Sequence, residues 1–281
     1  MPGSACRPLE PYAEASLFAY DDVSCSAIGT TVVDGVEYLG DSAVIIPPRQ
    51  GKTVTRNDFY ASIYCDLATN TLIVAYRGST TPSARWTDAD TQDWFKTNLL
   101  QRLGDPPEQY EYAYDLAYEV NERLDLGAFD NRCGNGRPKF LLTGHSKGGG
   151  EAQYAAILTR QKAIVFNSDA PNPLIFSERI TDDHDGWFEQ MIENVLRFFK
   201  SKALCGNPSQ NAYSYTRYFQ SGAIRDVRSV NDPLVSLFTT CRFPHAPFEW
   251  VLDRTSCSVS NGHSISALAR ELHLCATAGS P

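Results

Sequence analysis

The segment around Ser146 constrains the fold of this chain most. Residues 140–143 are apolar and short, as in a strand, and residues 148–160 have a helical pattern. Between them, residues 144–148 read Gly-His-Ser-Lys-Gly, which matches a sharp strand-to-helix turn of the pattern G-x-S-x-G. This turn raises Ser146 toward solvent at a helix N-terminus, where the helix dipole and free N–H groups favour developing negative charge. The pattern predicts a nucleophilic serine, and the strand and helix around it favour this interpretation over an incidental serine in a glycine-rich turn.

Strand and helix patterns alternate along most of the chain. Residues 58–66 and 71–76 are strand-like and joined by a short turn, so they predict a hairpin. Helix and strand then alternate, which predicts a mostly parallel sheet with helices on both faces. The 281 residues suffice for one large α/β domain. We therefore expect a single domain over residues 1–281, with its site at the carboxyl ends of the strands.

The residues around Ser146 resemble the class 3 lipases and related bacterial lipase-like α/β-hydrolases. Lys147 departs from the leucine common in class 3 lipases and resembles a branch whose turn reads GHSKGG. The resemblance extends over residues 12–274. It implies an α/β-hydrolase fold and the cleavage of carboxylic esters through an acyl-enzyme, with no metal and no cofactor.

A serine hydroxyl needs a base to take its proton, and the base needs an orienting carboxylate. In α/β-hydrolases these groups follow in the order serine, acid, histidine, which excludes His145 as the base. Asp232 lies in the sequence Val-Asn-Asp-Pro-Leu-Val, and the resemblance to an N-D-P segment of class 3 lipases implies that it is the acid. A structural Asp-Pro turn is the alternative. Asp169, just after the predicted strand 163–166, is a second candidate for the acid.

Three late histidines compete for the role of base. His263 lies at a loop-to-helix boundary, and the resemblance implies that it is the catalytic histidine. His245 lies in a Pro-His-Ala-Pro segment closer to Asp232. His273 lies inside the final amphipathic helix, residues 263–274, where we expect it to be packed.

The tetrahedral intermediate of acyl transfer needs fixed donors for its oxyanion. The backbone N–H of Lys147 is the expected first donor. Residues 71–79 end in Arg-Gly-Ser and resemble a lipase strand whose hydroxyl residue supplies the second donor, which implies Ser79; a plain Arg-Gly turn is the alternative. Residues 80–100 are either a lid over the site or a surface loop with packed tryptophans. Residues 175–220 are either a cap or a segment packed on the sheet edge.

Composition and charge exclude some classes of protein. The net charge of −8 argues against binding to a nucleic acid backbone. No apolar run is long enough for a bilayer, and the first ten residues lack the pattern of a signal peptide. We therefore expect a protein of the cytoplasm, or one exported by a signal-independent route. The eight cysteines contain no Cys-x-x-Cys pair, so a structural zinc site is not expected, and they are either disulfides or buried thiols.

Taken with the resemblance, these residues predict a serine hydrolase of lipid esters, either a lipase or similar to phospholipase A1. Its partners would be a lipid or acyl-ester substrate and, transiently, a lipid surface. Two alternatives belong to other classes: a soluble short-chain esterase, thioesterase or acyltransferase with the same triad, and a non-catalytic lipid-binding protein on this fold. An exported toxin against membranes is a biological alternative, and no motif indicates whether an inhibitory partner exists.

Overall fold

The fold is described from a computed structural model of the chain. The described residues are 6–20, 31–33, 35–41, 59–78, 108–169, 221–229, 248–251 and 264–277. They contain the following strands: β1 (Thr31–Val33), β2 (Val36–Asp41), β3 (Ala61–Asp66), β4 (Thr71–Tyr76), β5 (Lys139–His145), β6 (Lys162–Phe166), β7 (Ile224–Ser229) and β8 (Phe248–Val251). Their helices are η1 (Arg7–Leu9), α2 (Glu10–Phe18), α5 (Glu108–Asp125), α6 (Lys147–Thr159) and α12 (Ile265–Thr277).

The described strands form one eight-stranded sheet in which the spatial order equals the order in the chain. Strands β1 to β4 pair antiparallel, and β4 to β8 pair parallel. Parallel neighbours need a crossover, and the helices α5 and α6 supply the crossovers before and after β5. Because β4 to β8 are parallel, the carboxyl ends of β5, β6 and β7 meet at one end of the sheet.

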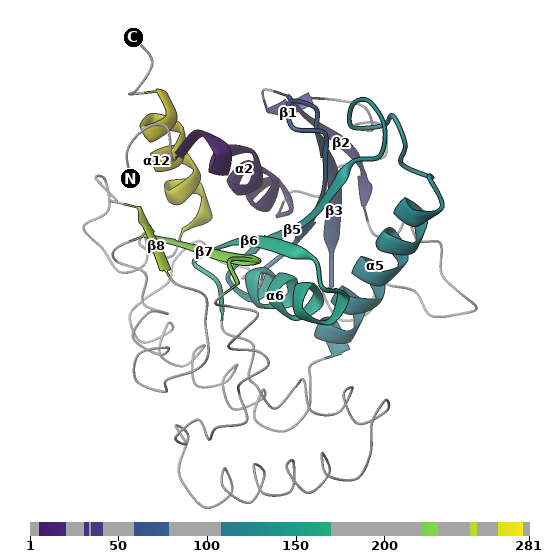
Figure 1. The fold of residues 1–281 in the computed structure, drawn as a ribbon. Helices are drawn as coiled ribbons and strands as arrows, with labels where there is room; N and C mark the ends of the chain where they lie inside the picture. Colours follow the sequence, from purple (N-terminus) through teal and green to yellow (C-terminus); the bar gives the residue numbers. More distant parts are fainter. Residues whose placement is uncertain are drawn as a thin grey trace, which may run out of the picture.

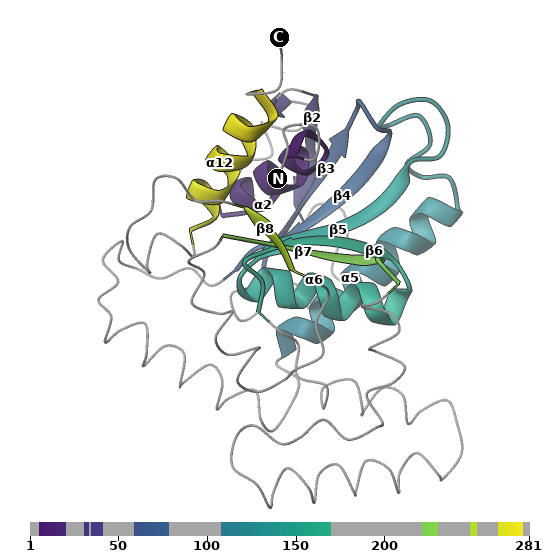
Figure 2. The ribbon, with the colours of Figure 1, turned by 60° about the vertical axis from the view of Figure 1, so that its left-hand side comes forward.

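Helices cover both faces of the sheet (Figure 1). Helices α5 and α6 lie together on one face, and α2 and α12 lie side by side on the other, as Figure 2 also shows. The strands alternate accordingly: in β4, Leu72 and Val74 join the core under α5 and α6, whereas Ile73 and Ala75 join the core under α2 and α12. All six residues of β4 are buried, as expected for a strand covered on both faces.

The structure confirms the predicted α/β-hydrolase fold, the mostly parallel sheet and the helices on both faces. It also confirms the predicted hairpin, which is β3 and β4 with the turn at residues 67–70. The antiparallel part is larger than one hairpin, because β1 and β2 extend it. The segments 80–100 and 175–220 lie outside the described residues.

A disulfide links the hairpin to the segment after α5. Cys65 at the end of β3 is bonded to Cys133, 68 residues away, and their Cα atoms are 4.9 Å apart. Cys6 is also disulfide-bonded. For these three cysteines, the alternative of buried free thiols is therefore wrong.

Candidate active site

Ser146 lies at the turn between β5 and α6, at the carboxyl end of the parallel strands. It is the N-terminal capping residue of α6, with φ 56° and ψ −124°. A positive φ is unfavourable for a residue with a Cβ, by about 1–3 kcal/mol, and is maintained only where the surroundings impose it. This is the strained strand-to-helix turn that the G-x-S-x-G pattern predicts. The expected exposure to solvent is wrong, however, because Ser146 is only 5% exposed.

The glycines of the turn allow the helix to approach the sheet closely. A Cβ on Gly144 would lie 2.3 Å from the carbonyl oxygen of Gly148, and a Cβ on Gly148 would lie 2.2 Å from the carbonyl oxygen of Tyr76. Both obstacles are backbone atoms, which cannot rotate away. At a third glycine, Gly149, a Cβ would lie 2.5 Å from the Cβ of Ser168, just after β6. Close contacts with β4, with β5 and with the segment after β6 therefore fix where α6 begins and where Ser146 lies.

The backbone of Ser146 is bonded to the next strand. Its N–H donates to the carbonyl of Phe166 at 3.2 Å, and its carbonyl accepts from the N–H of Asp169 at 2.9 Å. The carbonyl also accepts the first helical bond of α6, from Gly150 at 3.2 Å. Asp169, the second candidate for the acid, is therefore a direct backbone neighbour of Ser146.

His145 has a partner on the α2 side of the sheet. Its Nδ1 lies 2.8 Å from the hydroxyl of Tyr20, just after α2. Desolvation of this hydroxyl raises the pKa of Tyr20, with a smaller contribution from the negative charge of Glu151. The phenol is therefore neutral at physiological pH. It fixes the histidine that precedes Ser146, which agrees with the exclusion of His145 as the base by chain order.

The Lys147 side chain contacts α5 and its own helix, α6. Its Nζ donates to Oε1 of Gln109 at 2.7 Å and lies 3.7 Å from Oε1 of Glu151, one turn further along α6. The Glu151 carboxylate is buried, with 1% of its side chain exposed. A leucine at position 147 would leave this carboxylate without the nearby ammonium. The lysine that departs from the class 3 lipase pattern thus belongs to an ion pair under the turn.

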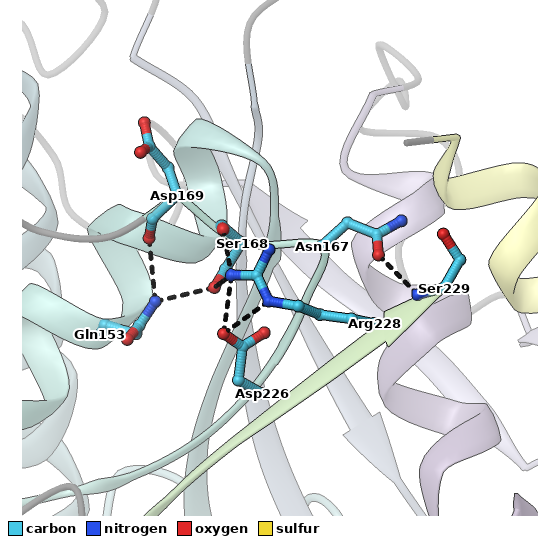
Figure 3. Close-up of polar contacts among 7 residues, drawn as sticks. All are labelled: Gln153, Asn167, Ser168, Asp169, Asp226, Arg228 and Ser229. Carbon is cyan, nitrogen blue, oxygen red and sulfur yellow. Dashed lines mark hydrogen bonds and ion pairs between the residues drawn. The ribbon is translucent and has the colours of Figure 1, made fainter. Parts of the chain in front are cut away.

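A buried polar network lies at the ends of β6 and β7 (Figure 3). Arg228 and Asp226 on β7 are both fully buried and form an ion pair of 2.8 Å. The guanidinium of Arg228 also donates to the backbone and side chain of Ser168, to which Gln153 of α6 donates from the other side at 2.9 Å. In the same view the Asp169 carboxylate points away from Gln153 and Arg228.

Several predicted site residues lie outside the described residues: Asp232, His263, His245 and Ser79. Arg77 and Gly78, which precede Ser79, are described, and a Cβ on Gly78 would lie 2.7 Å from the carbonyl oxygen of His145. The chain just after β4 therefore runs directly beside His145, the residue before Ser146.

His273 is not packed in the core as expected. It does lie in the final helix, but its side chain is 57% exposed and its Nδ1 is 2.5 Å from Oε1 of Glu10 on α2. The amphipathic pattern of α12 places Leu268 and Leu272 inward instead. A short acid–histidine pair between α2 and α12 thus accounts for the position of the His273 side chain.

Sequence reasoning missed the polar network of Arg228, Asp226, Ser168 and Gln153, as well as the ion pair of Glu151. One signal was present: Asp226 and Arg228 are two residues apart in the sequence, so within a strand both side chains must face the same side of the sheet. Opposite charges on one buried face predict an ion pair.

Within the described part of the chain, no group of three or more His, Cys, Asp or Glu side chains is arranged to hold a metal ion. No helix in the same part is both long and apolar enough to cross a membrane.

Comparison with known families agrees with this geometry. A family profile described as phospholipase-like, a Tle-like phospholipase domain, matches residues 34–177, just over half of the 281 residues. The chain belongs to this family. The matched region of the phospholipase-like domain contains β4, the turn at Ser146 and α6, and it ends before Asp232 and His263. Membership of the family supports the hydrolysis of lipid esters.

Solved structures similar to the chain include fungal lipases. The native propeptide complex of Rhizomucor miehei lipase is 13% identical and has a TM-score of 0.49, covering 90% of this chain and 70% of that one. A triacylglycerol lipase from Penicillium expansum is 14% identical, with a TM-score of 0.47 and coverage of 95% and 89%. At these identities and scores the likeness does not bear on activity. A search of curated protein sequences finds no match.

Proposed function

We propose that this phospholipase-like protein is a serine hydrolase that cleaves carboxylic esters of lipids through an acyl-enzyme on Ser146. The observation that carries the proposal is the backbone of Ser146, held at positive φ at the start of α6 by glycines that touch neighbouring backbone. Such strain persists where function requires it, and here it directs a hydroxyl to the carboxyl end of a parallel sheet.

In the proposed mechanism, His263 takes the proton from the Ser146 hydroxyl as the oxygen attacks the ester carbonyl. The backbone N–H of Lys147 and a donor from Ser79 stabilise the oxyanion. The leaving alcohol receives the proton from His263, and water then releases the fatty acid by the same steps. The buried position of Ser146 strengthens the electrostatic part of this catalysis, because low local polarity increases the effect of each donor.

The proposed acid is Asp232, which follows β7. Asp169 is the competing acid, supported by its backbone contact with Ser146 and by its position after β6. Substituting each acid separately distinguishes them. Asp232→Asn should lower kcat on a short-chain ester by about 10⁴-fold, whereas Asp169→Asn should change it by less than about tenfold. The reverse result would assign the acid to Asp169.

The proposed substrates are phospholipids, cleaved as by phospholipase A1, in transient contact with a lipid surface. Vesicles of mixed phospholipid and triacylglycerol, incubated with the protein and read by mass spectrometry, test this. We expect free fatty acid together with lysophospholipid that retains the sn-2 chain. Cleavage of short-chain esters with no lipid product would identify a soluble esterase instead, and transfer of the acyl group to an added alcohol would identify an acyltransferase.

We further propose that the protein works in an oxidising compartment. The Cys65–Cys133 disulfide supports this, because such bonds persist where thiols are not kept reduced. Alkylation of free thiols in protein taken from its native compartment, followed by mass spectrometry, tests it. Labelled Cys65 or Cys133 would contradict the proposal.

A further inference from the structure

The Arg228–Asp226 ion pair is fully buried, and a gain in the stability of the fold does not explain this burial. Both side chains are 0% exposed, and two guanidinium nitrogens, Nε and Nη2, donate to the same carboxylate oxygen at 3.0 and 2.8 Å. Removing two charges from water is costly, and well-packed apolar side chains of similar size often stabilise a core as well or better. The pair lies on the face of β7 that packs toward α6, the helix that begins at Ser146. An apolar pair would not make the other hydrogen bonds of Arg228.

Those contacts reach the corner after β6. Nη2 of Arg228 donates to the carbonyl of Ser168 at 2.5 Å and lies 3.3 Å from its hydroxyl. From the opposite side, Gln153 of α6 donates to the Ser168 hydroxyl at 2.9 Å and to the carbonyl of Asp169 at 3.0 Å. The corner at residues 168–169 is therefore held between β7 and α6 (Figure 3).

The same corner holds the backbone of Ser146. The N–H of Asp169 donates to the carbonyl of Ser146 at 2.9 Å, and Ser168 contacts the helix at Gly149, where a Cβ would lie 2.5 Å away. A continuous path of contacts thus runs from the guanidinium of Arg228 through Ser168 and Asp169 to Ser146.

Arg228 is also close in the chain to the proposed acid. Asp232 follows Arg228 by four residues in the chain. The next residue, Ser229, donates its N–H to Oδ1 of Asn167 at 2.9 Å, which ties the end of β7 to the end of β6. Arg228 therefore joins β7, the strand that leads to the acid, to the corner that holds the nucleophile.

We infer that Arg228 is a positioning residue for ester hydrolysis: its guanidinium fixes the corner at residues 168–169, and with it Ser146, relative to the end of β7. The inference rests on the proposed function. Fixing two catalytic elements matters because a misplacement of about 1 Å can cost about 100-fold in rate. Lysine keeps the positive charge at this position but has no planar fork to bind Asp226 and Ser168 together.

The test compares Arg228→Lys with wild type on a soluble short-chain ester and with a phosphonate that labels the serine. We expect kcat to fall by about 10- to 100-fold with KM within about threefold, and the second-order rate of labelling of Ser146 to fall in parallel. Leu124→Ala is the matched control, since it removes a buried side chain at the far end of α5 and should lower stability without lowering kcat per folded molecule. Circular dichroism establishes that each variant is folded.

A second variant covers the case in which Arg228→Lys does not fold. Gln153→Met removes both bonds from α6 to the corner without burying an unpaired charge, and it should lower kcat by about three- to tenfold. If Arg228→Lys, or Gln153→Met where the lysine variant does not fold, keeps kcat and labelling within twofold of wild type, the inference is overturned while the proposed function stands. A wild type that neither cleaves esters nor reacts with the phosphonate overturns the proposed function and this inference with it.

Discussion

The two ends of the same sheet are held in different ways. At the hairpin end, formed by the turn at residues 67–70 and the segment around Cys133, a disulfide and short side-chain bonds fix the chain. Asp66 accepts from the hydroxyl of Thr69 at 2.5 Å and from the N–H of Ala68 at 3.0 Å, and Asn70 donates to the carbonyl of Asn135 at 2.9 Å. At the opposite end, where β5, β6 and β7 finish, the chain is fixed in three ways. These are the positive φ of Ser146, the glycines of the turn in close contact with neighbouring segments, and the buried Arg228–Asp226 ion pair.

The two ends therefore differ in what their contacts achieve: those at the hairpin end stabilise the fold, whereas those at the opposite end fix where Ser146 lies. A disulfide and turn bonds stabilise the fold at little cost to the folded state. A positive φ at Ser146 and a fully buried ion pair each cost free energy, so their presence is explained by what they hold in place. Substitutions at the hairpin end should therefore change stability, whereas substitutions at the Ser146 end should change activity as well.

The largest effect is expected for Gly148→Ala at the Ser146 end. The new Cβ would lie 2.2 Å from the backbone oxygen of Tyr76, so either α6 or β4 must shift. We expect a loss of about 4 kcal/mol or more in the free energy of unfolding, and loss of ester hydrolysis in any protein that remains folded. Denaturant unfolding and a short-chain ester assay measure both. Gly136→Ala, where a Cβ meets nothing within 4 Å but φ is 78°, is the control for backbone strain alone.

Breaking the Cys65–Cys133 disulfide should be the next largest change, and it should affect stability alone. The bond closes a loop of 68 residues, so replacing both cysteines with serine should lower the free energy of unfolding by about 4 kcal/mol. Activity per folded molecule should stay within about twofold of wild type, because the disulfide lies at the end of the sheet away from Ser146. A fall of kcat greater than tenfold in folded double variant would show that the two ends are not independent.

Lys147→Met separates the role of a side chain from that of the backbone at the Ser146 end. It removes the ammonium from the buried carboxylate of Glu151 and from Gln109, and we expect a loss of about 2 kcal/mol in stability. It keeps the backbone N–H, the proposed oxyanion donor, so kcat should fall by less than about tenfold. The double variant Lys147→Leu with Glu151→Leu should recover part of the stability. A 1000-fold loss of kcat in Lys147→Met would mean that the side chain takes part in the chemistry.

The smallest effect is expected on the α2 face, at Glu14. Burial raises the pKa of its carboxyl, the negative charge of Glu10 raises it further, and His273 partly opposes both. A carboxyl whose pKa is raised by folding favours the folded state below its unfolded pKa of 4.5, and that contribution is lost as the pH rises through the folded pKa. Glu14→Gln should therefore stabilise the protein at pH 7 by about 0.5 kcal/mol or less, and not at pH 4. Thermal unfolding at the two pH values measures this, and equal stabilisation at both would contradict it.

The sequence was sufficient to predict the main elements, because each follows from local patterns. The hairpin follows from two apolar runs and a short turn, and the turn at Ser146 follows from glycines between an apolar strand and a helix. These patterns set backbone geometry within a few residues, so the predicted strands and helices agree with β3 to β6, α6 and α12 to within a few residues at each end.

The contacts between distant residues could not be predicted in the same way. Cys65 and Cys133 are 68 residues apart, and eight cysteines allow many pairings. Arg228 bonds Ser168 across 60 residues, and only the parallel register of β6 and β7 brings the two together. The exposure of Ser146 was predicted wrongly because the turn pattern fixes the direction of a side chain but not what surrounds it.

Covalent labelling of the protein shows whether Ser146 is the nucleophile. The folded protein is incubated with a lipid-like fluorophosphonate, its intact mass is measured, and the modified residue is identified by peptide mass spectrometry, with Ser146→Ala as the control. We expect one adduct per chain, located on Ser146, and neither adduct nor ester hydrolysis in Ser146→Ala. A wild-type protein that hydrolyses esters while Ser146 stays unlabelled, or a Ser146→Ala variant that keeps full activity, would contradict it.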